Sequence, residues 1–512
     1  MTSTAKNAAG TALLVALGVA AAVTGTAFVG APDDVVRDRP EQVEPVVRST
    51  SVCPYVGGEA RASSRVGVLA LEGVEEPDWE PPEGETDDEA EDPIVVRRLA
   101  GPDDEPDPFM SMAERGDPAS RAVERNNPAA FAVRAEGAMA PGVVAEQYML
   151  AQGPDLRGLV TAACTTPARE HWFVGASAEE GQRGRLILTN ASSTPALVSV
   201  ALWDDAGPVE AVGMKDISLP PRSQDVLLLD ALAPDAAQLG VRVRASQGRV
   251  TAAVDFRESA DGQPRGISMI PAAAAPATSV VVPGVPGHGE RTLHLLAPGD
   301  TDAIVNVRVL GVDGPFRPLD HDIVTVPAGA AVSVPIGEAI GDSPAAIELV
   351  SDEEITAAVR VVSTASDELP DVAYTAATEP LPASPTAAVL SRDTSALTSR
   401  LLLTAVGDMG GRVTVTRLDG DGTLLDEQVV DISAGRTADI ELESGEDTSW
   451  AVTLVQPAAA GTVVGVRETA GSDDDGRLVD MMPLVAPELT VRVPEVAGEL
   501  PAGLRPPEPI ER

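Results

Sequence analysis

The chain has 512 residues with 79 acidic and 37 basic side chains, which gives a formal net charge of −42. This excess of negative charge argues against nucleic acid as a partner, because each phosphate contact needs a cationic side chain to replace its counterions. Domains usually hold about 100 to 200 residues, so the length predicts three or four of them. A hydrophobic content of 44% is enough to give each domain a core.

An apolar stretch near the N-terminus predicts export. Lys6 precedes a run over Ala8–Val29 that is interrupted only by Gly and Thr, and acidic residues begin at Asp33. The run is long enough to span about 30 Å of hydrocarbon, and this order of charges places the bulk of the chain outside the cytoplasm. We therefore predict a signal anchor or signal peptide at 1–31 and a linker at 32–44. The expected location is the cytoplasmic membrane, single-pass with the bulk extracytoplasmic, and secretion after cleavage is the alternative.

The chain contains two cysteines, Cys53 and Cys164. An exported chain with one pair of cysteines is most simply interpreted as having one disulfide. Neither cysteine has a second Cys or a His at metal-ligand spacing, which argues against a metal site.

An internal repeat organises the rest of the sequence. The segment Leu186–Thr189 recurs as Leu293–Leu296 and as Leu401–Thr404, at offsets of 107 and 108 residues. The next valine-rich segment keeps the same offsets: Val198–Val200, Val305–Val307 and Val413–Val415. Agreement between independent segments indicates a repeated structural unit of about 107 residues.

Within a repeat, apolar residues alternate with period two. Val198, Val200 and Leu202 are separated by Ser199 and Ala201, as in a strand with one buried face. Short valine-rich strands separated by Gly, Pro and Asp turns are typical of antiparallel sandwiches. We predict an all-β protein built of tandem Ig-like β-sandwich domains after an N-terminal transmembrane or signal helix. A β-propeller is the alternative, although its blades usually repeat at about 40 to 50 residues.

The repeat offsets give the domain boundaries. The predicted domains are a divergent β-sandwich at 45–168 and three β-sandwich repeats at 169–277, 278–383 and 384–512, the last with a C-terminal strand and tail. The divergent copy carries an insertion at 72–108 with sixteen acidic residues. So much charge with so little to bury predicts a disordered acidic loop.

Several short motifs resemble an exported family of unknown function from high-GC Gram-positive bacteria. The segments that carry the resemblance are Cys53–Pro54, Ala163–Cys164, Trp172–Gly175, Leu186–Asn190, Pro195–Ala196 and Val198–Val200. The resemblance implies an anchored or secreted envelope protein, and it assigns no activity or catalytic residues.

Motifs for catalysis are missing from the sequence. It contains no GxxxxGK[ST], HExxH, CxxC or GxSxG pattern, and its four histidines lie in separate segments: His171, His288, His294 and His321. We therefore predict no catalytic, cofactor or metal residues. Calcium remains an open alternative, because the acidic turns at 300–302, 419–422 and 473–475 resemble oxygen-rich loops, although Asp and Gly also favour turns for backbone reasons.

These features together predict a non-enzymatic extracytoplasmic scaffold or interaction protein of the cell envelope. Its expected partner is an envelope protein or glycan, and it would meet a membrane only through the N-terminal helix. An envelope glycan- or ligand-binding protein is the alternative. Four Trp, three Tyr and six Phe in the whole chain leave few aromatics for a sugar platform.

Overall fold

The computed structural model describes residues 41–54, 62–78, 93–101, 106–123, 130–383, 388–391, 397–442 and 451–494. The chain divides into two compact units, one made of residues 1–44 and 491–512 and the other of residues 45–490. In the described part of the chain, the strands β1 (Glu41–Pro45) and β35 (Thr490–Pro494) pair in a sheet of their own.

The predicted single-pass membrane location is contradicted. The helices in the described residues are η1 (Gly137–Met139), α2 (Leu229–Leu232) and α3 (Gly337–Ile340). A membrane-spanning helix needs about 20 residues, and no described helix is long and apolar enough. The segment 1–31, where the sequence predicts the apolar helix, lies outside the described residues.

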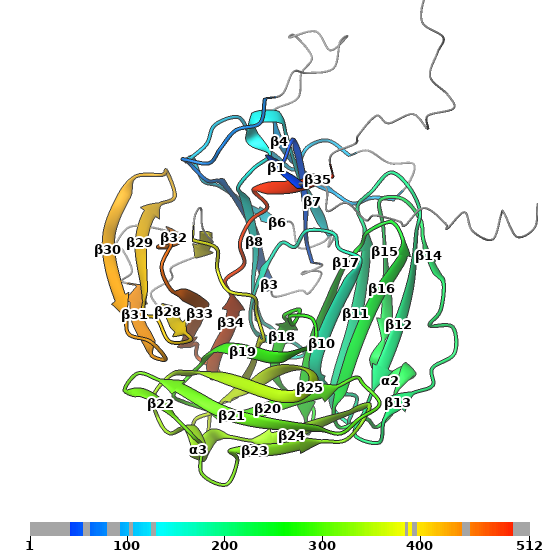
Figure 1. Ribbon diagram of the computed structural model, residues 1–512. Helices are drawn as coiled ribbons and strands as arrows, with labels where there is room; N and C mark the ends of the chain where they lie inside the picture. The colour runs from blue at the N-terminus through cyan, green and yellow to red at the C-terminus, as the bar shows by residue number, and fades with distance from the viewer. Residues whose placement is uncertain are drawn as a thin grey trace, which may run out of the picture. The chain divides into compact units, whose positions relative to one another are not determined.

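Four successive strand sets make up the larger unit, coloured from blue to orange along the chain in Figure 1. Set 1 contains β2 (Arg48–Cys53), β3 (Ala62–Ala70), β4 (Ile94–Arg98), β5 (Met110–Met112), β6 (Ala119–Val123), β7 (Phe131–Glu136), β8 (Val143–Gln152) and β9 (Arg157–Ala163). Set 2 contains β10 (Glu170–Ala176), β11 (Gln182–Asn190), β12 (Ala196–Trp203), β13 (Pro208–Val209), β14 (Ile217–Leu219), β15 (Ser223–Leu228), β16 (Leu239–Gln247), β17 (Thr251–Ala260) and β18 (Gln263–Ile270).

The third and fourth sets follow the same plan. Set 3 contains β19 (Ala277–Val285), β20 (Glu290–Ala297), β21 (Ala303–Gly311), β22 (Gly314–Phe316), β23 (Ile323–Val326), β24 (Ala330–Pro335), β25 (Ala345–Ser363) and β26 (Asp371–Ala376). Set 4 contains β27 (Ala388–Ser391), β28 (Leu397–Val406), β29 (Gly411–Asp419), β30 (Leu424–Ile432), β31 (Thr437–Leu442), β32 (Ala451–Pro457), β33 (Thr462–Ser472) and β34 (Arg477–Pro483).

Each set forms two antiparallel sheets with one strand order. In set 2 the outer sheet runs β10-β16-β12 and the inner sheet runs β15-β11-β17-β18. The other sets repeat this order, as β2-β7-β4 with β6-β3-β8-β9 and as β27-β32-β29 with β31-β28-β33-β34. In set 3 the long strand β25 serves both sheets, because its first half pairs with β19 and β21 and its second half with β20 and β26.

The two sheets of a set enclose a core of alternating apolar residues. In β21 every second residue from Ala303 to Val309 is buried, while Ile304, Asn306 and Arg308 are exposed. In set 2 the buried residues of the outer sheet, such as Val241, pack against those of the inner sheet, such as Leu186. Period-two burial of this kind explains why valine dominates these strands.

The all-β class is confirmed, but the finer Ig-like topology is not found. An immunoglobulin domain pairs its first strand with its second. Here the first strand of each set pairs with a strand late in the set: β2 with β7, β10 with β16, β19 with β25 and β27 with β32. The sets also do not follow one another as an open tandem row, because the last strand of set 4, β34, contacts the last strand of set 1, β9. The inner sheets therefore meet around a centre, as propeller blades do, although their strand order is not that of consecutive hairpins.

The acidic segment 72–108 differs from the predicted disordered loop. Ile94, Val95 and Val96 are buried in β4, which pairs with β7 and forms part of the outer sheet of set 1. This strand was missed because its three apolar residues stand between two acidic runs. Residues 79–92 and 102–105 lie outside the described residues.

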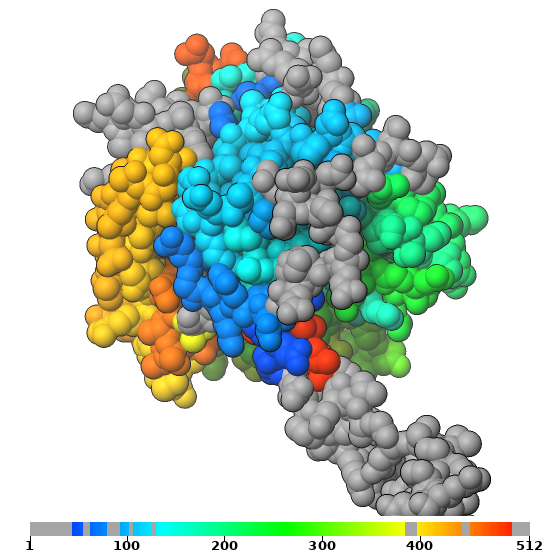
Figure 2. Space-filling model, turned by 90° about the horizontal axis from the view of Figure 1, so that it is seen from above, coloured from blue at the N-terminus to red at the C-terminus, as the bar shows by residue number. Residues whose placement is uncertain are grey.

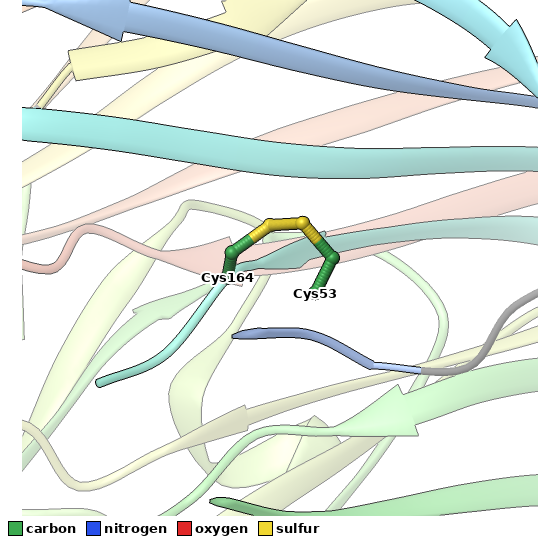
Figure 3. Close-up of a disulfide and its surroundings, with 2 residues drawn as sticks. All are labelled: Cys53 and Cys164. Carbon is green, nitrogen blue, oxygen red and sulfur yellow. A yellow bond between two sulfur atoms is a disulfide. The ribbon is translucent and has the colours of Figure 1, made fainter. Parts of the chain in front are cut away.

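A disulfide joins Cys53, at the end of β2, to Cys164, directly after β9. Figure 3 shows the two side chains meeting between these segments. Next to the bond, Val52 and Thr165 exchange backbone hydrogen bonds of 2.8 and 3.0 Å. The disulfide therefore links the outer sheet of set 1 to the end of its inner sheet.

Removal of this disulfide tests its contribution to stability. The bond joins residues 111 positions apart, and loss of a native disulfide typically lowers the free energy of unfolding by about 2 to 5 kcal/mol. We expect the double variant Cys53→Ala/Cys164→Ala to lose stability in this range in urea unfolding. A reducing agent should lower the stability of the wild-type protein and leave the variant unchanged. Equal stability of both proteins under oxidising conditions would contradict the prediction.

Candidate functional site

The last strand of each inner sheet lies at the centre of the larger unit. We call these strands, β9, β18, β26 and β34, the axial strands. Each axial strand pairs with one neighbour in its own sheet, and it contacts the axial strands of the adjacent sets in a closed cycle. The free edge of each inner sheet therefore faces the centre. Such edges carry backbone N–H groups that need acceptors when they are buried.

The side chain of Asp371, on β26, supplies that acceptor for all four sets. Oδ2 of Asp371 accepts the backbone N–H groups of Leu159, on β9, and Val479, on β34, at 3.0 and 3.1 Å. Its Oδ1 accepts those of Ile267, on β18, and Val372, on β26, at 3.3 and 3.0 Å. Asp371 is 0% exposed. One carboxyl group thus binds a donor from every strand set, and we call these four N–H groups the axial ring.

Glycine in two other sets leaves room for this carboxyl group. Gly158 and Gly266 precede the ring donors of sets 1 and 2, and both have φ values of the kind that favours glycine, +145° and +137°. A Cβ atom would lie 2.5 Å from Asp371 Oδ1 at Gly158 and 2.8 Å from it at Gly266. A side chain in either place would displace the carboxyl group, so the chain accommodates one such group at the centre.

Two opposing effects act on the pKa of Asp371. Complete burial raises the pKa well above its ordinary value, because the ionised form loses its hydration. The four N–H donors oppose that rise, since they bind the ionised form more strongly. A protonated carboxyl would also direct its own O–H toward a ring of donors, where it finds no acceptor.

Sets 1 and 4 meet along what we call the closing seam, which holds a buried ion pair. Arg467, on β33, donates to both carboxylate oxygens of Glu146, on β8, at 2.6 and 2.9 Å. The side chains of this pair are 1% and 5% exposed. Removing either partner would leave an uncompensated buried charge, which is strongly destabilising.

A second carboxyl group lies beside this pair. Asp480, on β34, accepts hydrogen bonds from both the backbone N–H and the hydroxyl of Thr161, on β9. Burial raises the pKa of Asp480 to about 7, with Glu146 adding to the rise while Thr161 and Arg467 oppose it. The closing seam therefore contains a group that titrates near neutral pH.

Arg157 completes the seam at the start of β9. Its guanidinium donates to Asp473 Oδ1 at 2.6 Å and to the carbonyl oxygens of Arg477 and Pro370 at 2.8 and 3.4 Å. Burial would raise the pKa of Asp473, but the hydrogen bonds from Arg157 and Gln152 outweigh it and lower that pKa. Arg157 thus joins strand sets 1, 3 and 4.

Aromatic side chains occupy the contact between sets 2 and 3. Trp172 and Trp203 stack with ring centroids 5.6 Å apart, and they pack on Leu296 of set 3. Nearby, His294 is completely buried, and burial together with the charge of Arg360 lowers its pKa to about 3. Neither ring nitrogen of His294 has a hydrogen-bond partner. This histidine is therefore a neutral residue of β20.

A cavity of about 230 Å³ lies at the opposite end of the axial strands from Asp371. Its walls come from the C-terminal ends of three axial strands and from the segment after the fourth: Ala162, Ala163, Met269, Ile270, Met481, Met482 and Thr378. Most of the lining is apolar. The hydroxyl of Thr378 is an exception, because it is buried without a hydrogen-bond partner.

The other histidines do not come together. Nε2–H of His171 donates to the carbonyl oxygen of Val250 at 2.8 Å, and burial lowers the pKa of this histidine. Nε2 of His288 lies 2.6 Å from Oε1 of Glu468, at the contact between sets 3 and 4. His321 lies between β22 and β23.

The acidic turns use their carboxylates to hold local backbone. Asp419 Oδ1 accepts the N–H groups of Asp421 and Thr423, and Asp302 Oδ1 accepts that of Ala328. Asp473 binds the N–H groups of Asp475 and Gly476 as well as Arg157. In the residues that the structure describes, no three or more His, Cys, Asp or Glu side chains are grouped so as to hold a metal ion.

Sequence reasoning did not single out the groups that meet at the centre. Asp371 and Asp480 are two among 79 acidic residues, and Arg157 and Arg467 are ordinary members of strand patterns. One signal was available: Asp480 interrupts the apolar residues of β34, and Arg467 directly follows the apolar start of β33. A charge within such a strand indicates a buried partner, because unpaired charges are rarely fully buried.

The pH dependence of stability tests the position of Asp480. Its pKa is raised in the folded protein, so its protonation favours folding at low pH and this contribution is lost as the pH rises toward 7. Between pH 5 and pH 8 the loss amounts to about 2 to 3 kcal/mol. We expect Asp480→Asn, measured by urea unfolding, to lack this part of the pH dependence. The exposed Asp431→Asn is the control, and parallel profiles of wild type and Asp480→Asn would overturn the prediction.

Comparisons with known proteins identify a family and no activity. No curated protein matches the chain. A solved structure, a calcium-binding mutant of Bacteroides uniformis β-glucuronidase 2, matches with 12% identity and a TM-score of 0.12. The match covers 46% of this chain and 26% of that one, so the chain spans about a quarter of its length, and so low a TM-score carries no argument.

A family model covers more of the chain. It matches residues 119–443, from β6 of set 1 to the end of β31 in set 4, and is described as a family of unknown function (DUF5719). The resemblance to a family of unknown function is thereby confirmed, while its bacterial source and export stay predictions. Since the match spans more than half of the sequence, the chain belongs to the DUF5719 family.

Proposed function

We propose that the protein is a non-enzymatic interaction scaffold that works as one rigid body in an oxidising compartment. The observation that carries the proposal is that the charged groups buried in the interior bind the strand sets to one another. Asp371 binds all four strand sets, and Arg467 with Glu146 joins the first set to the last. Charged groups that bind one another and the backbone in this way fix the relative positions of the sets and are poorly placed to act on a substrate.

The disulfide supports the proposed compartment. The bond between Cys53 and Cys164 would be reduced in a cytosol that keeps thiols reduced, whereas oxidising compartments preserve such bonds. A scaffold of this kind needs exposed contact surface, because the charged groups at its centre are engaged with one another.

The strand β30 offers a surface for a protein partner. In the described part of the chain, β30 pairs only with β29, so its other edge is open. Leu424, Leu425 and Val429 are 58%, 40% and 60% exposed, and the gold surface of this region is visible in Figure 2. An extended segment of a partner could add to this edge through backbone hydrogen bonds. Asp426 and Glu427, which are exposed on the same strand, favour a basic segment.

A lysine substitution on the open edge of β30 tests the proposed protein partner. We expect Val429→Lys to abolish capture of a protein partner from the native source, because a lysine on an open edge blocks strand addition. The control is Val212→Lys, at a turn position between β13 and β14 that is 96% exposed. Capture should survive in the control. Equal loss in both variants, or saturable glycan binding without any protein partner, would contradict the scaffold.

The axial cavity favours a second function, binding of a small apolar ligand. An engineered cavity of about 150 Å³ is large enough to bind benzene, so a cavity of about 230 Å³ accepts a somewhat larger molecule. The unpartnered hydroxyl of Thr378 would bind one polar group of that ligand. We therefore consider a phenol-like or short-chain alcohol ligand as the alternative to the protein partner.

A substitution that fills the cavity distinguishes ligand binding there from binding elsewhere on the protein. Phenol at a concentration about a hundredfold above its Kd should raise the free energy of unfolding of the wild-type protein by about 2.7 kcal/mol, because it binds only the folded state. We expect Ala253→Leu, in the cavity wall, to remove this stabilisation and the exposed Ala201→Leu to retain it. Thermal unfolding with and without phenol measures both. Absence of any shift in the wild-type protein would exclude the alternative.

A further inference from the structure

The axial ring has the composition of an anion-binding site. Its four members are backbone N–H groups, each from a different strand set, and they point at one small space. Converging backbone N–H groups bind anions in other proteins, because each donates a hydrogen bond and together they present partial positive charge. Here no cationic side chain takes part, since all four hydrogen bonds to Asp371 come from the backbone.

The donors result from the fold and do not depend on Asp371. An axial strand bonds its sheet neighbour on one side, so alternate N–H groups on the other side face the centre whatever the side chains are. In sets 1 and 2 the position that corresponds to Asp371 is glycine, and in set 4 it is Leu478, which packs with Tyr148 and Leu159 instead. Among the described residues, Asp371 thus supplies the carboxyl group that binds these four N–H groups.

The chemistry of the space selects a carboxylate. Two oxygens that each accept two N–H groups match four donors, whereas an amide has one acceptor oxygen and would place its NH₂ against two of them. An apolar side chain would leave all four donors unpaired, and each buried unpaired N–H is destabilising. Water could accept two of the four.

We propose that the axial ring is a binding site for a small carboxylate anion and that Asp371 is its tethered ligand. The side chain beyond the Cα atom is CH₂–COO⁻, which has the size of acetate. Replacing Asp371 with glycine would therefore open an acetate-sized site at the centre. Replacing it with alanine would keep the Cβ atom and leave space for formate alone.

Chemical rescue of the full-length variants tests the proposal. Thermal unfolding of wild type, Asp371→Gly and Asp371→Ala would be compared in sodium chloride, formate and acetate at equal ionic strength and neutral pH. We expect both variants to unfold several degrees below wild type in chloride. Acetate should raise the midpoint of Asp371→Gly in a saturable way, and formate should do so for Asp371→Ala. The wild-type midpoint should be the same in all three salts. Anion-dependent shifts of the unfolding midpoint that are equal in all three proteins would overturn the proposal.

Two further measurements cover the case in which the glycine variant does not fold in chloride. Refolding yield in acetate is then the readout, and folding that requires acetate supports the proposal, whereas failure in every salt contradicts it. Asp371→Asn, which keeps the shape and removes the charge, should unfold below wild type and should gain nothing from either anion. Stability of this variant equal to that of wild type would show that the ring needs no anion.

Discussion

Four open sheet edges meet inside the protein, and the need to satisfy their buried N–H groups governs the rest of the structure. The axial strands β9, β18, β26 and β34 each pair on one side only, so none of them can satisfy the groups on its inner edge within its own sheet. The carboxyl group of Asp371 accepts one N–H from each strand. Because this single group contacts all four strand sets, a displacement of any set breaks a buried hydrogen bond, and the sets behave as parts of one body.

The contacts between neighbouring sets combine apolar packing with charged groups. Sets 2 and 3 are joined by the packing of Trp172 and Trp203 on Leu296 and by an ion pair between Arg360 and Glu258. Sets 1 and 4 are more than 300 residues apart at their contact, and there the charged groups Arg467, Glu146, Arg157 and Asp473 form the closing seam. Apolar surfaces tolerate many relative positions, whereas a bidentate ion pair accepts few. The ion pair of the closing seam is more deeply buried than the one between sets 2 and 3, with side chains 1% and 5% exposed against 19% and 12%, which fits a role for buried polar groups in specificity.

The sequence was sufficient to predict the strands and insufficient to predict how they close. The segments Leu186–Thr189, Leu293–Leu296 and Leu401–Thr404 lie on β11, β20 and β28, the second main strand of their sets, as equal offsets require. Period two reports which face of a strand is buried, but it contains nothing about which edge is buried, so the axial ring has no periodic signal. Asp371 follows Pro370 and resembles a turn residue. The strand that contains Ile94–Val96 was not predicted, because three apolar residues are too few to change the acidic composition of the segment around them.

The net charge of −42 acquires a different meaning once the interior is known. On composition it argues only against nucleic acid as a partner. In the structure, Asp371, Asp480 and Glu146 are buried at the centre, and Arg157 and Arg467 are almost fully buried beside them. A carboxyl group in such a place needs donors, which an edge strand supplies through its backbone and an arginine through its guanidinium. The protein uses both, with backbone donors at Asp371 and guanidinium donors at Glu146 and Asp473. These interior groups are engaged with one another, so we place the proposed protein partner at the open edge of β30 and the alternative ligand in the cavity at the far end of the axial strands.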